Sequence, residues 1–79
     1  MNLTESELKV LQRLQELDCG DMQGAYWPIR ATVRELGLNI EDEKEFAREL
    51  ERKGLVNSRG GAPCLLITQK GREAIGKSC

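Results

Sequence analysis

The charged side chains of residues 39–53 have the spacing of a helical surface. Three basic residues recur at every fourth position, and three glutamates recur at the same interval beside them: Lys44, Arg48 and Arg52, and Glu41, Glu45 and Glu49. Such a surface can contact a charged partner. It can also be a solvated face on which pairs such as Glu41–Lys44, Glu45–Arg48 and Glu49–Lys53 each contribute ~0.2–0.5 kcal/mol. The spacing by itself leaves both interpretations open.

Residues suited to catalysis or metal binding are scarce. The chain has no histidine, and its three cysteines, Cys19, Cys64 and Cys79, are widely spaced with no CxxC pair, so a zinc site has too few ligands. The Gly60-Gly61 pair does not have the spacing of a phosphate loop, and the clustered acids lie along one helix rather than across a cleft. The sequence therefore predicts no enzyme, no metal and no cofactor, and we expect the cysteines to be free thiols.

Length and composition indicate one small globular domain spanning residues 1–79. Of the 79 residues, 39% are hydrophobic and 32% are charged, which suits a globular rather than a disordered chain. No apolar run approaches the ~20 residues of a membrane span, and residues 1–9 lack the pattern of a signal peptide. We therefore expect a cytoplasmic protein.

The first half of the chain predicts two helices. Thr4 and Glu7 have the spacing of a capping box, and apolar residues then follow a helical period until about Asp18. A short extended piece at residues 25–27 precedes Pro28, which suits the start of a helix. The second helix has Ile29, Val33 and Leu36 on one face, and Gly37 is its expected left-handed C-cap.

The second half predicts a third helix, two strands and a short final helix. Asn39 is the expected N-cap of the third helix, with Phe46, Ala47 and Leu50 facing inward and Gly54 after its end. Two strands are expected around a glycine-rich tip at residues 59–62, with Pro63 beginning an edge strand. Thr68 should cap the last helix, residues 69–75, from which Ala74 and Ile75 should pack on the core.

Two stretches resemble a known group of proteins. The run LGLNIEDEKEFARELERKGLV resembles the turn and second helix of MarR-like and related small bacterial or archaeal winged-helix regulators, and LLITQKGREAI resembles the end of their wing. The resemblance covers residues 29–75. It implies an α+β, mostly helical fold of the winged helix-turn-helix type: a three-helix core with a β-hairpin wing and a short C-terminal helix.

The resemblance also implies a function and a set of contacts. The protein would be a DNA-binding transcriptional regulator, with the third helix in the major groove of double-stranded DNA. Ile40, Glu41, Lys44, Glu45 and Arg48 would then be presented to the bases, and Arg59 of the wing to the phosphates or the minor groove. The predicted DNA-binding residues are Asn39, Lys44, Arg48, Arg52 and Arg59. Many such regulators dimerise through terminal helices, and a homodimer formed by the first and last helices would double the number of basic contacts. The alternative is that Leu14 and Leu17 of the first helix pack in the core of a monomer.

A second function stays open because winged helices also serve as protein-interaction modules. On this alternative the chain binds little or no DNA, and a partner protein docks on residues 41–52 or on the loop that carries Tyr26 and Trp27. The acids at the start of the third helix favour this alternative, since carboxylates repel phosphates. They also have a structural explanation, because the positive end of the helix dipole favours negative charge.

Overall fold

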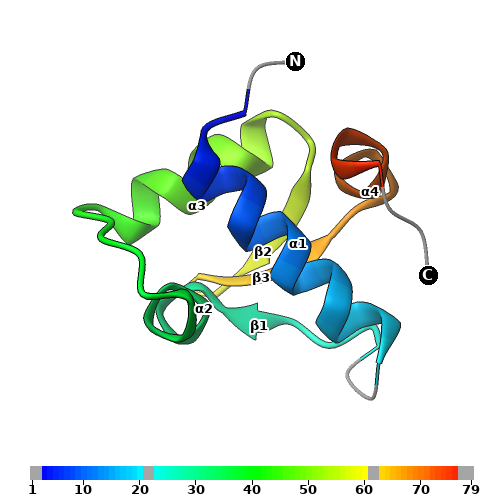
Figure 1. The fold of residues 1–79 in the computed structure, drawn as a ribbon, viewed down its shortest axis with the longest axis horizontal. Coiled ribbons are helices and arrows are strands. Elements are labelled where there is room, and N and C mark those ends of the chain that lie inside the picture. Colours follow the sequence, from blue (N-terminus) through cyan, green and yellow to red (C-terminus); the bar gives the residue numbers. More distant parts are fainter. Residues whose placement is uncertain (1–2, 21–22, 61–62, 77–79) are drawn as a thin grey trace.

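In the part of the chain that the structure describes, four helices and three strands follow one another in the predicted order. The computed structural model describes residues 3–20, 23–60 and 63–76. The elements are α1 (Glu5–Cys19), β1 (Trp27–Pro28), α2 (Ile29–Leu36), α3 (Glu43–Arg52), β2 (Val56–Arg59), β3 (Cys64–Ile67) and α4 (Gln69–Ile75). Figure 1 shows α1 crossing in front of the sheet, with the other three helices around it. The predicted α+β, mostly helical class is confirmed.

The strands form an antiparallel sheet in the order β1-β3-β2. Leu65 of β3 lies opposite Trp27 on one side and Ser58 on the other. The prediction that Pro63 begins an edge strand is wrong, since β3 is central and Pro63 lies just before it. Pro63 instead accepts a hydrogen bond through its carbonyl from the backbone N–H of Ile29, at 2.9 Å. Of the expected hairpin tip, residues 61–62 lie outside the described residues.

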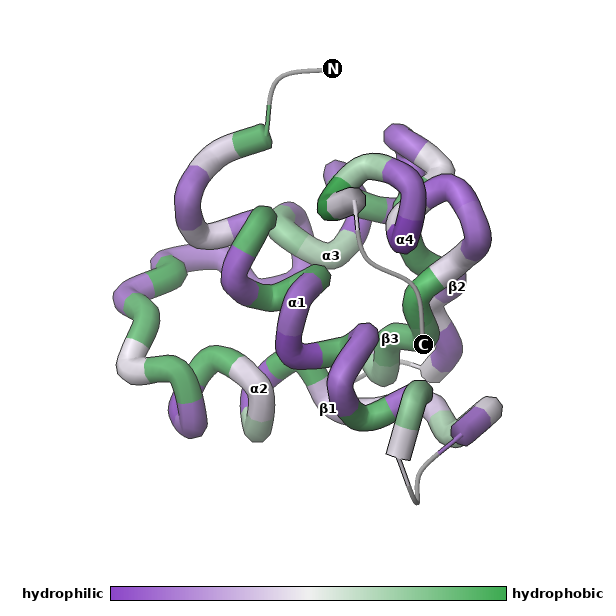
Figure 2. The backbone as a smooth tube through the Cα atoms, turned by 45° about the vertical axis from the view of Figure 1, so that its right-hand side comes forward, coloured by the Kyte–Doolittle hydropathy of each residue, from purple (hydrophilic) through white to green (hydrophobic). Residues whose placement is uncertain are grey.

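Helix α1 begins at the predicted capping box. Thr4 Oγ1 accepts from the Glu7 N–H at 3.1 Å, and Glu7 Oε1 accepts from the Thr4 N–H at 2.9 Å. Hydrophilic and hydrophobic residues then alternate along the helix (Figure 2). Its apolar face contacts α2, α4 and β3, so α1 is the element around which the others pack.

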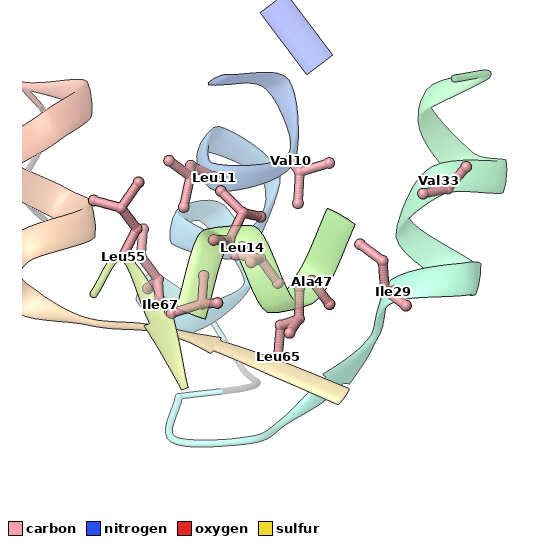
Figure 3. Close-up of a cluster of buried hydrophobic side chains, with 11 residues drawn as sticks. Val10, Leu11, Leu14, Ile29, Val33, Ala47, Leu55, Leu65 and Ile67 are labelled. Carbon is pink, nitrogen blue, oxygen red and sulfur yellow. The ribbon is translucent and has the colours of Figure 1, made fainter. Parts of the chain in front are cut away.

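The hydrophobic core lies between α1, the sheet and the helices that flank it. Figure 3 shows side chains from α1, α2, α3 and β3, together with Leu55, gathered in one cluster. Eleven buried residues make up this cluster: Val10, Leu11, Leu14, Ile29, Val33, Ala47, Leu50, Leu55, Val56, Leu65 and Ile67. Phe46, expected to face inward, is only partly buried against it, and this leaves part of its ring at the surface.

The last helix is fixed by hydrogen bonds to the segment that ends α3. Thr68 caps α4 as predicted, accepting from the Gly71 N–H at 3.1 Å, and its hydroxyl donates to the Gly54 carbonyl at 2.6 Å. The Thr68 N–H donates to the Leu55 carbonyl at 3.0 Å. Ile75 packs partly buried against the core as expected. Ala74 is exposed, so its predicted packing is wrong.

Within the described residues, no helix combines the length and apolar character needed to cross a bilayer. The expectation of free thiols is wrong at Cys19, which is disulfide-bonded.

Candidate functional site

Helix α3 starts later than the sequence suggested. Its N-cap is Asp42, whose side chain accepts from the Glu45 N–H at 3.0 Å, whereas Asn39 was the predicted cap. Asp42 and Glu43, at the start of the helix, are favoured by the helix dipole there, and Arg52 by its negative end. The first turn therefore has a local electrostatic reason for its acids.

The segment between α2 and α3 is longer than a tight turn. Gly37 ends α2 in the left-handed conformation, with φ at 67°, as predicted. Leu38 and Ile40 then pack partly buried against the core, which holds this stretch outside the helix. Asn39 is exposed between them. Asn39, Ile40 and Glu41 consequently precede α3 rather than forming its first turn.

Two of the predicted residues meet the wing in one groove. This wing groove, about 260 Å³ in volume, lies between α3 and the β2–β3 hairpin. Its lining residues are Lys44, Ala47, Arg48, Glu51, Ser58, Gly60 and Pro63. Arg59 is exposed at the end of β2, beside Gly60, and Arg52 is exposed one turn beyond Arg48. The structure thus brings Lys44 and Arg48 to the wing, while Asn39 lies outside this groove.

A pair of hydrogen bonds that the sequence analysis missed ties the wing to α3. Glu51 Oε2 accepts from the backbone N–H of Ser58 at 3.2 Å and from its hydroxyl at 2.6 Å. The two residues are seven positions apart, on a helix and a strand, so no periodic pattern connects them. This contact holds the wing beside the basic residues of α3. It also engages Glu51, the one acidic residue among the described residues that line the groove.

The exposed ion pairs on α3 follow the helical spacing only in part. Arg48 lies 3.7 Å from Glu45, as predicted, and Arg52 lies 3.1 Å from Glu49. The predicted Glu49–Lys53 pair is wrong, because Lys53 forms its ion pair with Glu7 of α1. Exposed pairs of this kind contribute roughly 0–1 kcal/mol, so Arg48 and Arg52 can exchange them for other anions at little cost.

Tyr26 and Trp27 differ in how they are held. The guanidinium of Arg59 lies over the Tyr26 ring, 5.0 Å from its centroid, which is within the range of a cation–π contact. Trp27 is part of β1 and packs partly buried against the core, and its buried Nε1 has no hydrogen-bond partner among the described residues. Tyr26 therefore supports the wing residue Arg59, while Trp27 serves mainly the core.

The opposite edge of α3 borders a second groove. This α1–α3 groove, about 490 Å³ in volume, is lined by Thr4, Glu7, Ile40, Glu41, Asp42, Glu45, Phe46, Glu49 and Lys53. None of these residues lines the wing groove. The acidic and basic stripes still adjoin, since Glu45 and Glu49 pair with Arg48 and Arg52, and Glu41 lines one pocket together with Lys44 and Pro63. The three glutamates face the start of α1, and Lys44 and Arg48 face the wing.

A partly buried ion pair closes one end of the α1–α3 groove. Lys53 Nζ donates to Glu7 Oε2 at 2.8 Å, and the side chain of Glu7 is 5% exposed. Burial raises the pKa of the Glu7 carboxyl. The hydrogen bonds from Lys53 and from the Thr4 backbone, with the charge of Lys53, outweigh that effect and hold the pKa below its usual 4.5. This pair joins the end of α3 to the start of α1.

The Glu7→Gln variant is expected to show a pH-dependent loss of stability. Glutamine still fits a capping box but cannot form the ion pair, so we expect the free energy of unfolding to fall by about 1–2 kcal/mol near neutral pH. Because the folded-state pKa is lowered, the stabilisation by Glu7 is complete above about pH 4.5 and is lost as the pH falls through the lower folded value. Urea denaturation at several pH values measures this difference. A gap between wild type and variant that is unchanged at pH 3 would contradict the assignment.

No protein-family model matches the chain, and no significantly similar curated protein or solved structure is found.

Proposed function

We propose that this protein is a winged-helix protein that binds double-stranded DNA and acts as a transcriptional regulator. The order of elements supports the winged-helix interpretation: three helices precede a β-hairpin, and a short helix follows. A two-residue strand beside that hairpin completes the sheet. In this fold α3 is the helix that enters the major groove, and the β2–β3 hairpin is the wing.

The observation that carries the proposal is the wing groove. Lys44 and Arg48 come from α3 and face Ser58 and Gly60 of the hairpin across one concave surface. Arg59 follows Ser58 in β2 and therefore points to the other face of the wing, where its guanidinium lies over the Tyr26 ring; it adds a third exposed basic side chain to the wing. Lysine and arginine side chains that neutralise phosphates supply most of the affinity of non-specific DNA binding, and here they stand on the two elements that a winged helix uses.

The acids of α3 are compatible with this mode of binding because of where they lie. Glu45 and Glu49 border the α1–α3 groove, on the other edge of the helix, whereas Glu41, Asp42 and Glu43 line a pocket beside Lys44 and Pro63. Glu51 does line the wing groove, but its carboxylate is held by two hydrogen bonds from Ser58. A duplex seated over the wing groove would therefore contact Lys44 and Arg48, and the acids beside Lys44 would weaken the attraction. With few basic contacts in each chain, binding should be weak and strongly dependent on salt.

The proposal predicts specific effects of charge reversal on DNA binding. With about three phosphate contacts, the affinity for a mixed-sequence duplex should fall roughly 40-fold between about 50 and 200 mM salt. Arg48→Glu and Arg59→Glu should each weaken binding at least about tenfold. Each should also reduce the slope of log affinity against log salt by the equivalent of about one phosphate contact. Fluorescence anisotropy with a labelled duplex measures both effects.

A matched control is available on α1. Lys9→Glu makes the same type of charge change on an exposed side chain. Lys9 pairs with Glu5 and lines a groove between α1 and α2, away from the wing. This substitution should change the affinity less than threefold. No detectable binding by the wild type at about 50 mM salt, or an equal loss in all three variants, would refute the proposed DNA interface.

A further inference from the structure

The α1–α3 groove combines an apolar floor with an acidic rim. Ile40 and Phe46 are partly buried against the core, and each leaves part of its side chain at the surface. Both line the groove, and around them stand Glu41, Asp42, Glu45 and Glu49. An apolar surface enclosed by polar residues is characteristic of a protein-interaction site.

The charge of this rim is largely free to act on a partner. Lys53 is the single basic residue among those that line the groove, and its ammonium is already bound to Glu7. Glu45 and Glu49 pair with Arg48 and Arg52 through exposed contacts that stabilise little. Asp42 uses one carboxylate oxygen to cap α3, and Glu41 is exposed just before the helix. The rim therefore presents a negative field to anything seated over Ile40 and Phe46.

We propose that this groove binds a basic amphipathic helical segment of a partner protein. The apolar side chains of such a segment would contact Ile40 and Phe46, and its lysine or arginine residues would face the acidic rim. Charge complementarity selects this occupant: a nucleic acid would be repelled by the same carboxylates, and an acidic peptide would be as well. The groove shares no lining residue with the wing groove, so a partner here and a duplex there occupy opposite edges of α3.

A model peptide tests this inference independently of DNA binding. The probe is a synthetic 14-residue helix with leucine on one face and lysine on the other, titrated into the ¹⁵N-labelled chain. We expect micromolar binding, with the largest amide shifts in and around residues 40–49 and at Lys53. A peptide with glutamate in place of lysine, and one with serine in place of leucine, should each bind at least tenfold more weakly.

Variants of the protein give the complementary measurement. Glu41→Lys and Glu45→Lys reverse charge at exposed positions of the rim without changing the apolar floor, and together they should weaken the lysine peptide at least tenfold. Glu73→Lys, at an exposed position on α4, makes the same change away from the groove and should leave the affinity within twofold. Each variant is first shown to keep the wild-type spectrum elsewhere, so that unfolding is not mistaken for lost binding.

Several outcomes would overturn the inference. One is equal affinity for the lysine and glutamate peptides, and another is a set of shifts outside the α1–α3 groove. Dilution-dependent shifts of the same residues without peptide would instead identify a second copy of the chain as the occupant. Displacement of the peptide by duplex DNA would show that one surface serves both ligands. If the chain binds no DNA but does bind the peptide at this groove, the proposed function fails and this inference stands.

Discussion

Replacing Gly71 with alanine is expected to lower the free energy of unfolding by about 3 kcal/mol, through overpacking of a close contact. A Cβ atom at this position would lie 2.3 Å from the Leu55 carbonyl oxygen and 2.8 Å from Cγ1 of Ile67. The first neighbour is backbone, held by its hydrogen bond from Thr68, so α4 itself must move. Chemical denaturation followed by circular dichroism measures the loss.

The expected loss at Gly71 is opposite in sign to the usual effect of this substitution. Alanine in place of glycine inside a helix normally stabilises by about 1 kcal/mol, so a clash must outweigh a gain in helix propensity. Glu73→Ala, at an exposed position two residues further along α4, is the matched control and should change stability by less than about 0.5 kcal/mol. If Gly71→Ala proved as stable as the wild type or more so, α4 would not pack on Leu55 as the structure has it.

Arg72→Met is expected to cost about 3 kcal/mol, because it leaves a buried carboxylate without its counter-charge. Arg72 forms an ion pair with Asp18, and its Nε donates to Gln15 Oε1 at 2.9 Å. The side chain of Asp18 is only 6% exposed, and its other oxygen accepts from the Gly24 N–H at 2.9 Å. Methionine keeps much of the apolar stem of arginine but none of its donors. The melting temperature should fall by about 4–8 °C for each kcal/mol lost.

Arg52→Met is the control for that substitution. Arg52 is 64% exposed and pairs with Glu49, which is itself 42% exposed, so the same chemical change should cost less than about 1 kcal/mol. Near-equal losses in the two variants would show that the contacts of Arg72 with α1 contribute no more than a surface pair. In that case α4 would be held mainly by Gly71 and Ile75.

Local sequence patterns were sufficient where a structural feature depends on neighbouring residues. The Thr4–Glu7 box, the left-handed Gly37 and the Thr68 cap were all predicted, since each involves residues within a few positions of one another. The cap of α3 shows the limit of such patterns. Asn39 and Asp42 are both good N-cap residues, and the choice between them depends on the packing of Leu38 and Ile40 against distant parts of the core.

Local sequence patterns could not predict the contacts that join distant segments of the chain. Lys53 was assigned to its helical neighbour Glu49, yet it binds Glu7, 46 positions away. The central place of β3 was missed because its second partner, β1, has two residues, too few to show any periodicity. For the candidate site, the spacing of charges predicted two stripes, but only the packed structure shows which edge of α3 each one faces.

The place of β3 in the sheet has a consequence for how the chain acquires its structure. The strand that holds the sheet together is also the last of the three to leave the ribosome, and α1 packs directly on it. Until Ile67 has emerged, Leu11 and Leu14 have no sheet to cover, and neither β1 nor β2 has a hydrogen-bonded neighbour. Folding should therefore be delayed during synthesis rather than proceed from the N-terminus, with apolar surface open to chaperones for several seconds at ordinary translation rates.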